Sequence, residues 1–343
     1  MFKNIKNKKI LIIGGAGFIG HNVALELNKY GAQTTIVDGL QVNNLLSMVD
    51  NIYQLPFPEI SKLIIEERLQ LMRSNSINLI VQDARDYHAL SKVIDDIKPQ
   101  IIIHLAAVSH ADRSNKTPFS TFDHSLRTLE NALDASRENL EQFIFLSSSM
   151  VYGNFKSNEV TEEAVCEPIG IYGALKYAAE KIIIAYKQVF GVNYTIIRPS
   201  ALYGERCVSR RVGQIFIENA LNDKKIVING DGNDKLDFTY IKDLINGIMT
   251  VIDNKNSKNQ IFNLTYGEGR KITDMIEILK KYFPNLEVDF KSRDKLQPHR
   301  GTLSTKKAEN LIGYKSKWPL EKGYPEYIKW YTEFFEKIKN NKL

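Results

Sequence analysis

Short apolar runs alternate with longer amphipathic segments through the first 200 residues of the chain. Apolar segments with helical spacing lie between these runs, the clearest at residues 18–30, 87–97, 118–136 and 172–190. The runs themselves cover residues 9–13, 33–37, 77–81, 100–104, 143–146 and 192–197. Uninterrupted apolar runs of this length are typical of buried parallel strands, and the segments between them are long enough for crossover helices. The pattern predicts an α/β fold with a doubly wound parallel sheet, whose ligands bind at the carboxyl ends of the strands.

The alternation weakens after residue 198, where short elements and loops become frequent. We therefore expect residues 1–198 to form a nucleotide-binding domain of the Rossmann type, with residues 237–266 rejoining its sheet. The two remaining segments, 199–236 and 267–343, are expected to form a smaller C-terminal α/β lobe that binds the substrate.

A long connection, residues 41–76, separates the second predicted strand from the third. Apolar residues at near-helical spacing predict a helix over residues 59–73. A connection of this length is usually a lid, an interface or a family-specific insert, and a surface helix packed on the domain is an equally open interpretation.

A glycine-rich turn joins the first strand to the first helix. Gly14, Gly17 and Gly20 follow the apolar run, and Phe18 and Ile19 lie at the start of the helix. Glycine lets the backbone approach a pyrophosphate closely, and the helix N-terminus supplies free N–H groups and the positive end of the helix dipole. The turn therefore predicts a dinucleotide cradle formed by these five residues.

An acid closes the second strand. Asp38 lies 18 residues beyond Gly20, where a carboxylate usually binds the hydroxyls of the adenosine ribose. A carboxylate in this place would repel a 2′-phosphate. The predicted cofactor is therefore NAD.

Three further residues have the types and the spacing of a proton-transfer site. Tyr172 and Lys176 are four residues apart in a predicted helix, so they share one helix face. An ammonium one turn away, together with a positively charged nicotinamide ring, is expected to lower the pKa of the phenol from its ordinary value of about 10. Ser148 lies in a run of three serines after the fifth strand and can share the hydrogen bond to a substrate hydroxyl. We expect these three residues to be catalytic.

Composition and charge exclude several classes of partner. The net charge is +6, but many lysines lie near the two ends of the chain and no stripe of arginines alternates with aromatic residues. Nucleic acid is therefore not expected, whereas a mildly basic surface suits phosphorylated small molecules. No apolar run approaches the roughly 20 residues of a membrane span, and the first strand begins too soon after Met1 for a signal peptide. Cys166 and Cys207 are expected to be free thiols in the cytoplasm, and no metal site is expected.

Together these motifs resemble the extended short-chain dehydrogenase/reductase superfamily, in the branch of NAD-dependent epimerases and dehydratases that act on nucleotide-diphosphate sugars. The resemblance covers nearly the whole chain. It implies that, besides the glycine turn and Asp38, the cofactor is contacted by Asp83, Ala84, Leu105, Ala106, Ala107, Tyr172 and Lys176.

The resemblance also implies where the substrate binds. Family positions near the sugar correspond to Ser109, His110, Arg113, Ser149 and Met150. The arginine that usually binds the substrate pyrophosphate is replaced by Leu236. We therefore expect other basic residues to share that role, among Arg206, Arg210, Arg211, Lys235 and Arg300.

One departure from the family bears on the reaction. Its 4,6-dehydratases place a glutamate close after the catalytic threonine, where this chain has Ser149 and Met150. Neither residue can act as acid or base at C5 and C6, so a 4-epimerase is expected, with Tyr172 taking the proton of the sugar 4-hydroxyl. A dehydratase that takes its acid and base from the loop around His110 and Asp112 is the alternative, followed by a 4-ketoreductase. A non-catalytic dinucleotide sensor would not need the three catalytic residues.

Members of this family commonly form dimers through a four-helix interface. By that analogy we expect a homodimer held by the helices at residues 118–136 and 172–190.

Overall fold

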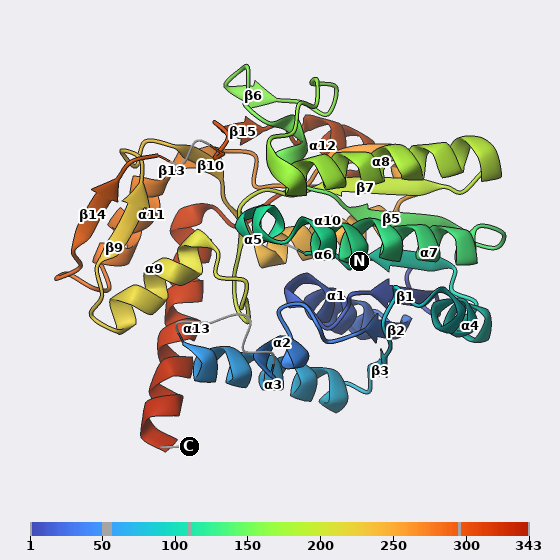
Figure 1. Cartoon of the computed structure of the whole chain (residues 1–343), viewed down its shortest axis with the longest axis horizontal. Coiled ribbons are helices and arrows are strands. Elements are labelled where there is room, and N and C mark those ends of the chain that lie inside the picture. The colour runs from blue at the N-terminus through green and yellow to red at the C-terminus, as the bar shows by residue number, and fades with distance from the viewer. Residues whose placement is uncertain (1, 50–56, 109–110, 294–295, 342–343) are drawn as a thin grey trace.

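The computed structural model describes residues 2–49, 57–108, 111–293 and 296–341, and a seven-stranded parallel sheet forms its centre (Figure 1). The strand order is β12-β7-β5-β4-β1-β2-β3. The strands are β1 (Lys9–Ile13), β2 (Gln33–Asp38), β3 (Asn78–Val81), β4 (Ile101–His104), β5 (Gln142–Leu146), β7 (Tyr194–Arg198) and β12 (Gln260–Asn263). The order reverses between β1 and β4, as in a doubly wound fold, so the predicted fold class is confirmed.

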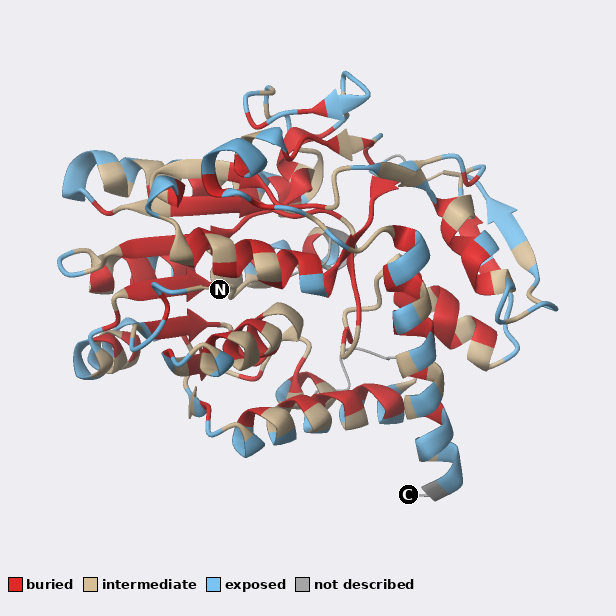
Figure 2. Ribbon diagram, turned by 180° about the vertical axis from the view of Figure 1, so that it is seen from behind, coloured by how far each residue is buried: buried red, intermediate tan, exposed pale blue. Residues whose placement is uncertain are grey.

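Helices cover both faces of this sheet (Figures 1 and 2). Ile10 and Ile12 of β1 belong to one apolar core, whereas Leu11 and Ile13 belong to another, because side chains alternate across a strand. The first core includes α1 (Phe18–Lys29), α3 (Pro58–Ser74) and α10 (Ile241–Asp253). The second includes α4 (Tyr87–Ile97), α7 (Thr128–Ser136) and α8 (Gly170–Phe190). Burial on both faces explains why the strands are apolar throughout.

Short strand pairs and further helices form a lobe on the left of Figure 1. Its strands are β8 (Leu202–Tyr203) with β11 (Thr239–Tyr240), β9 (Ile226–Asn229) with β14 (Val288–Lys291), and β10 (Lys235–Asp237) with β13 (Gly269–Lys271). Its helices include α9 (Val212–Leu221), α11 (Ile272–Lys280) and α13 (Leu320–Asn341). At the top of the view lie the strand pair β6 (Glu159–Val160) with β15 (Thr302–Leu303), and α12 (Lys306–Ile312). Residues 260–263 return to the central sheet as its edge strand, whereas residues 235–240 pair with the short strands.

Several elements differ from the sequence-based expectation. The helix expected over residues 118–136 is interrupted, since a π-helical turn at Asp123–Arg127 separates α6 (Pro118–Phe122) from α7. The expectation of a loop from 109 to 114 is wrong from residue 111 onward, where α5 (Ala111–Lys116) begins. The sequence pattern also missed α2 (Leu45–Val49) and the single 3₁₀ turns at Ser149–Tyr152 and Lys255–Ser257. Short elements of this kind carry too few residues for a periodic pattern.

Two further properties concern the chain as a whole. In the described ranges, no helix combines the length and apolar character needed to cross a bilayer. Cys166 and Cys207 are free thiols.

Candidate active site

The glycine turn forms a cradle at the start of α1. Gly14 has a φ of +77°, and a Cβ at this position would lie 2.6 Å from the backbone nitrogen of Ala106. Only glycine therefore fits between β1 and the end of β4. Gly17 precedes the first residue of α1, and no side chain caps the helix, so N–H groups at its N-terminus remain available to an anion.

A cavity of about 140 Å³ adjoins the cradle. All the cofactor residues expected from the glycine turn, from Asp38 and from the ends of β3 and β4 line it, namely Gly14, Gly17, Phe18, Ile19, Gly20, Asp38, Asp83, Ala84, Leu105, Ala106 and Ala107. The structure thus brings together residues from four separate strand ends, because the carboxyl ends of parallel strands meet at one edge of a sheet.

Asp38 is held in place by two backbone amides. Its Oδ2 accepts a hydrogen bond from the Ala16 N–H at 2.9 Å, and its Oδ1 accepts one from the Leu40 N–H at 2.7 Å. Burial raises the pKa of this carboxyl, and the two amides act in the opposite direction. A carboxylate oxygen can accept a second hydrogen bond, so Asp38 can still bind ribose hydroxyls.

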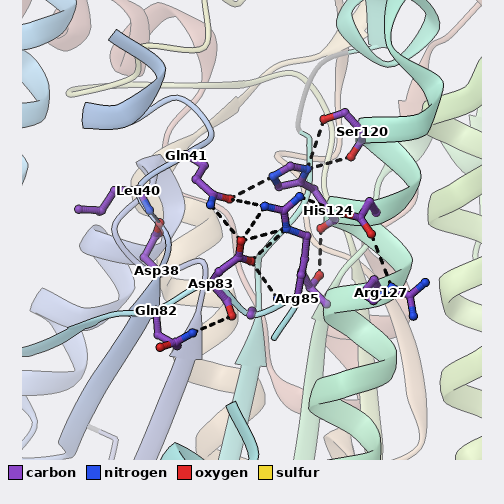
Figure 3. Close-up of polar contacts among 12 residues, drawn as sticks. Asp38, Leu40, Gln41, Gln82, Asp83, Arg85, Ser120, His124 and Arg127 are labelled. Carbon is purple, nitrogen blue, oxygen red and sulfur yellow. Dashed lines mark hydrogen bonds and ion pairs between the residues drawn. The ribbon is translucent and has the colours of Figure 1, made fainter. Parts of the chain in front are cut away.

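A polar network surrounds Asp83 at the predicted adenine end of the cavity (Figure 3). Burial alone would raise the pKa of Asp83, but hydrogen bonds from Arg85 hold it well below its usual range. Gln41 donates to Asp83 at 2.9 Å, and its carbonyl oxygen lies 3.2 Å from Nε2 of His124, which belongs to the π-helical turn. Sequence reasoning missed Gln41 and His124. Neither residue belongs to a motif, and neither lies at a set number of residues from one.

The second cavity holds about 420 Å³ and contains the three expected catalytic residues. Ser148 follows β5, while Tyr172 and Lys176 lie on consecutive turns of α8. The ammonium of Lys176 donates to the Leu146 carbonyl at 2.6 Å and lies 4.7 Å from the centre of the Phe145 ring. Burial lowers the pKa of Lys176 to about 8.

The environment of Tyr172 differs from the sequence-based expectation. Burial raises the pKa of its phenol, and the influences that lower it are the charge of Arg211 and a hydrogen bond with Ser148. Lys176, which was expected to lower this pKa together with the nicotinamide ring, is not among these influences, and its ammonium donates to the Leu146 carbonyl. Arg211 is the cation that acts on Tyr172.

Only some of the expected phosphate-binding residues reach this cavity. Arg210, Arg211 and Arg300 line it, and the buried Nε atoms of Arg211 and Arg300 have no hydrogen-bond partner among the described residues. Burial, together with the nearby charge of Arg211, lowers the pKa of Arg300 to about 10. Two half-buried arginines, each with a buried Nε that has no hydrogen-bond partner among the described residues, suit a diphosphate.

The expectation is wrong for Arg206 and Lys235, which line neither described cavity. Arg206 instead pairs with Glu67 at 3.3 Å, and Lys235 is exposed on β10. For Lys235 the reason is the alternation of side chains along a strand. Leu236 faces the cavity, so the neighbouring side chain of Lys235 must face away from it.

The remaining expected sugar-binding residues divide into two groups. Ser149 and Met150 line the cavity. Ser109, His110 and the side chain of Arg113 lie outside the described part of the chain. Sequence reasoning missed Asn229 and Gln297, which come from the C-terminal lobe and have no motif around them.

A buried ion pair holds the segment that follows β5 and carries Ser148. Glu180, one turn after Lys176, binds Arg198 through two hydrogen bonds of 3.0 and 2.6 Å, and both side chains are buried. Glu180 also accepts from Ser147, and Arg198 donates to Tyr152 at 2.9 Å. The pair therefore joins α8 to both ends of the segment that carries Ser148.

No group of three or more His, Cys, Asp or Glu residues within the described ranges could hold a metal ion.

Comparison with known proteins identifies the family of this chain. The model of the NAD dependent epimerase/dehydratase family matches residues 10–265. The uncharacterized UDP-glucose epimerase YtcB of Bacillus subtilis is 27% identical over 336 residues, which are 96% of this chain and 99% of that protein. The dTDP-D-glucose 4,6-dehydratase of Mus musculus is 26% identical over 344 residues, which are 97% of this chain and 91% of that protein.

The solved structures give the same result. The UDP-glucuronic acid 4-epimerase of Bacillus cereus, in complex with UDP-glucuronic acid and NAD, superposes with a TM-score of 0.84 at 26% identity and covers 94% of this chain and 99% of its own. The chain therefore belongs to the NAD dependent epimerase/dehydratase family and is an NAD-dependent nucleotide-sugar epimerase/dehydratase.

Proposed function

We propose that this enzyme is a 4-epimerase, which interconverts nucleotide-diphosphate sugars that differ in configuration at C4. The observation that carries the proposal is the lining of the larger cavity. No Asp, Glu or His occurs among its described lining residues, and Ser149 and Met150 occupy the positions after Ser148. Removal of water from C5 and C6 needs an acid and a base, whereas epimerisation at C4 needs only a group that takes and returns one proton.

Tyr172 is the group proposed to move that proton. Its hydroxyl lies in the cavity within hydrogen-bond reach of Ser148. The positive charge of Arg211 and the hydrogen bond with Ser148 favour the phenolate when Tyr172 gives up its own proton. The glycine turn and Asp38 would hold NAD, which would supply reversible hydride transfer to this site. Ser148 orients the hydroxyl for both directions of transfer.

Arg211 and Arg300 are proposed to bind the diphosphate of the substrate. Their side chains come from different segments, one before α9 and one before β15, and both have a buried Nε without a partner in the described structure. This pair replaces the arginine that the family usually has at the position of Leu236. The two charges also balance the two negative charges of a nucleotide diphosphate.

The reaction can be tested by the mass and stereochemistry of the product. We expect the enzyme, incubated with UDP- and dTDP-sugars without added NADH, to give a product of unchanged mass and inverted C4 configuration by proton NMR. A product lighter by one water, roughly 18 Da from stoichiometry, would contradict the epimerase proposal and direct attention to His110 and Asp112. Consumption of added NADH in equal amount would instead indicate a ketoreductase.

We also propose that the enzyme is a homodimer through α6 and α8. These helices contact each other and expose large apolar residues on their outer surface, namely Phe119, Phe122, Ile171, Val189 and Phe190. Exposed large apolar side chains on two adjacent helices are typical of a protein interface.

A further inference from the structure

The insert helix α3 buries an arginine in the middle of its apolar face. Ile60, Ile64, Arg68 and Met72 follow one another at intervals of four and are all buried. Arg68 is only 1% exposed. Burying a guanidinium costs free energy unless its N–H groups are bonded, so a position in an apolar row calls for specific partners.

The partners of Arg68 are backbone carbonyls. Its Nε donates to the Arg206 carbonyl at 2.8 Å, Nη2 donates to the same oxygen, and Nη1 donates to the Asn43 carbonyl at 3.4 Å. Asn43 and Arg206 are 163 residues apart in the chain. Arg68 therefore ties together two segments that the sequence keeps separate.

Both of these carbonyls belong to residues with an unfavourable backbone conformation. The φ angles are +52° at Asn43 and +64° at Arg206. Such conformations are unfavourable for residues other than glycine and persist where surrounding contacts hold them. The guanidinium of Arg68 supplies such contacts at both places.

The neighbouring residue of α3 holds the same loop by its side chain. Glu67 pairs with the guanidinium of Arg206 at 3.3 Å, and this guanidinium lies 5.9 Å from the centre of the Trp330 ring on α13. In Figure 1, α3 accordingly extends below the sheet toward α13. Arg206 thus accepts hydrogen bonds from Arg68 at its backbone carbonyl and forms an ion pair with Glu67 through its side chain.

The loop that begins at Arg206 borders both cavities. Val208 and Ser209 line the cofactor cavity, together with Arg68 itself. Arg211 lines the cofactor cavity and the substrate cavity. The position of this loop therefore determines how the dinucleotide is enclosed and where Arg211 lies relative to Tyr172.

We propose that Arg68, assisted by Glu67, is a positioning residue that holds the loop from Arg206 to Arg211 over the cofactor cavity and keeps NAD bound through repeated turnovers. This assigns a role to the insert at residues 58–74. An enzyme that returns its hydride to the substrate gains from a cofactor that does not leave between the two transfers. The inference rests on NAD binding and not on the proposed position of the reaction at C4.

The test measures release of NAD without any sugar nucleotide. Protein loaded with radiolabelled NAD is freed of excess label and then diluted into unlabelled NAD, and the bound label is followed with time. We expect Arg68→Met to release NAD at least about tenfold faster than the wild type, since hydrogen bonds from a charged donor are lost. Arg68→Lys, which keeps the cation, should give an intermediate rate.

A matched control removes a guanidinium from the exposed face of the same helix. Arg73→Met should release NAD at the wild-type rate, because Arg73 is exposed and near the end of α3. Circular dichroism and thermal unfolding establish that each variant is folded. A folded Arg68→Met protein with a release rate within twofold of the wild type would overturn the proposal.

A second variant tests the same proposal if Arg68→Met does not fold. Glu67→Gln removes the charge that pairs with Arg206 and keeps the volume of the side chain. The Glu67 side chain is 29% exposed. We expect release two- to threefold faster than in Arg73→Met, and equal rates would overturn the proposal. A dehydratase would give the same NAD release rates as a 4-epimerase. The release assay therefore tests only the role of Arg68, and the product assay tests only the proposed reaction at C4.

Discussion

At the scale of single residues, the position of one cation changes the chemistry of Tyr172. The sequence relates Tyr172 to Lys176 by helical spacing, whereas the folded chain places Arg211 where its charge lowers the pKa of the phenol. Burial acts against this and raises the pKa of Tyr172. The hydroxyl is therefore protonated at neutral pH.

Replacing Tyr172 tests its role directly. We expect Tyr172→Phe to fold and to bind NAD but to lose turnover by about 10²–10⁴-fold, because the only proposed proton acceptor for the sugar hydroxyl is gone. Initial rates with the accepted sugar nucleotide, and NAD binding by calorimetry, provide the two readouts. A variant that keeps more than about a tenth of the wild-type rate would rule out Tyr172 as the base.

Asp38 offers a second test at this scale. We expect Asp38→Asn to bind NAD more weakly and to narrow the preference for NAD over NADP by about tenfold, because the amide no longer repels a 2′-phosphate. Calorimetric titration with both cofactors measures the ratio. Asp95→Asn, an exposed change on α4, is the control, and an unchanged ratio in Asp38→Asn would refute the assigned role.

At the scale of secondary-structure elements, one buried carboxylate joins three segments of the C-terminal part. Asp237, at the end of β10, accepts hydrogen bonds from the Thr265 hydroxyl at 3.0 Å, from the Gly267 N–H at 3.2 Å and from the Leu303 N–H at 3.1 Å. Burial raises its pKa to about 6 despite these donors. An amide in its place would turn an NH₂ group toward N–H donors.

We expect Asp237→Asn to lower the free energy of unfolding by roughly 2 kcal/mol or more at low pH. Because the folded-state pKa is raised, the folded protein holds more protons than the unfolded chain between about pH 4 and 6. The wild type therefore loses stability as the pH rises through about 6, and the difference from the variant shrinks. Urea unfolding of both proteins from pH 4 to 7 measures this trend, and a difference that grows with pH would contradict it.

The periodic elements could largely be predicted at this scale. Six of the seven strands of the central sheet and the long helices carry strong apolar patterns, and most of their observed bounds lie within two residues of the expected ones. The helix at 118–136 was predicted without its π-helical turn, because the extra residue in that turn depends on packing against neighbouring elements. The strands of two or three residues around the lobe are set by pairing between distant segments, which periodicity does not reveal.

At the scale of the whole molecule, α6 and α8 present the surface proposed to pair two subunits. Phe119 is 88% exposed and Val189 is 71% exposed, although both are apolar. The positive charge of the chain does not oppose such an interface, because no lysine-rich run of the sequence falls in these helices.

We expect the wild type to sediment as a dimer at micromolar concentration and Phe119→Asp to shift it toward the monomer, because an interface cannot readily bury an unpaired carboxylate. Phe290→Asp, on exposed β14 in the C-terminal lobe, is the matched control and should leave the dimer intact. A monomeric wild type would refute the proposed interface.

The sequence by itself determined the features whose signals are local. A strand followed by Gly14, Gly17 and Gly20 specifies a cradle through backbone geometry alone, and Asp38 lies at a fixed distance beyond it. Tyr172 and Lys176 are related by one helical turn. These features therefore indicate the family, the fold class and NAD.

The tertiary structure alone decided which of the scattered cations act at the site. Arg206 and Arg211 are five residues apart in one loop, yet one pairs with Glu67 and the other faces both cavities. In the sequence, Arg68 is a charged residue at a position where the helical spacing predicts an apolar one. Only the fold shows that it binds two distant carbonyls. The physical reason is that the partners of a buried charge come from segments brought together by the sheet and the lobe, and no local pattern records which segments will meet.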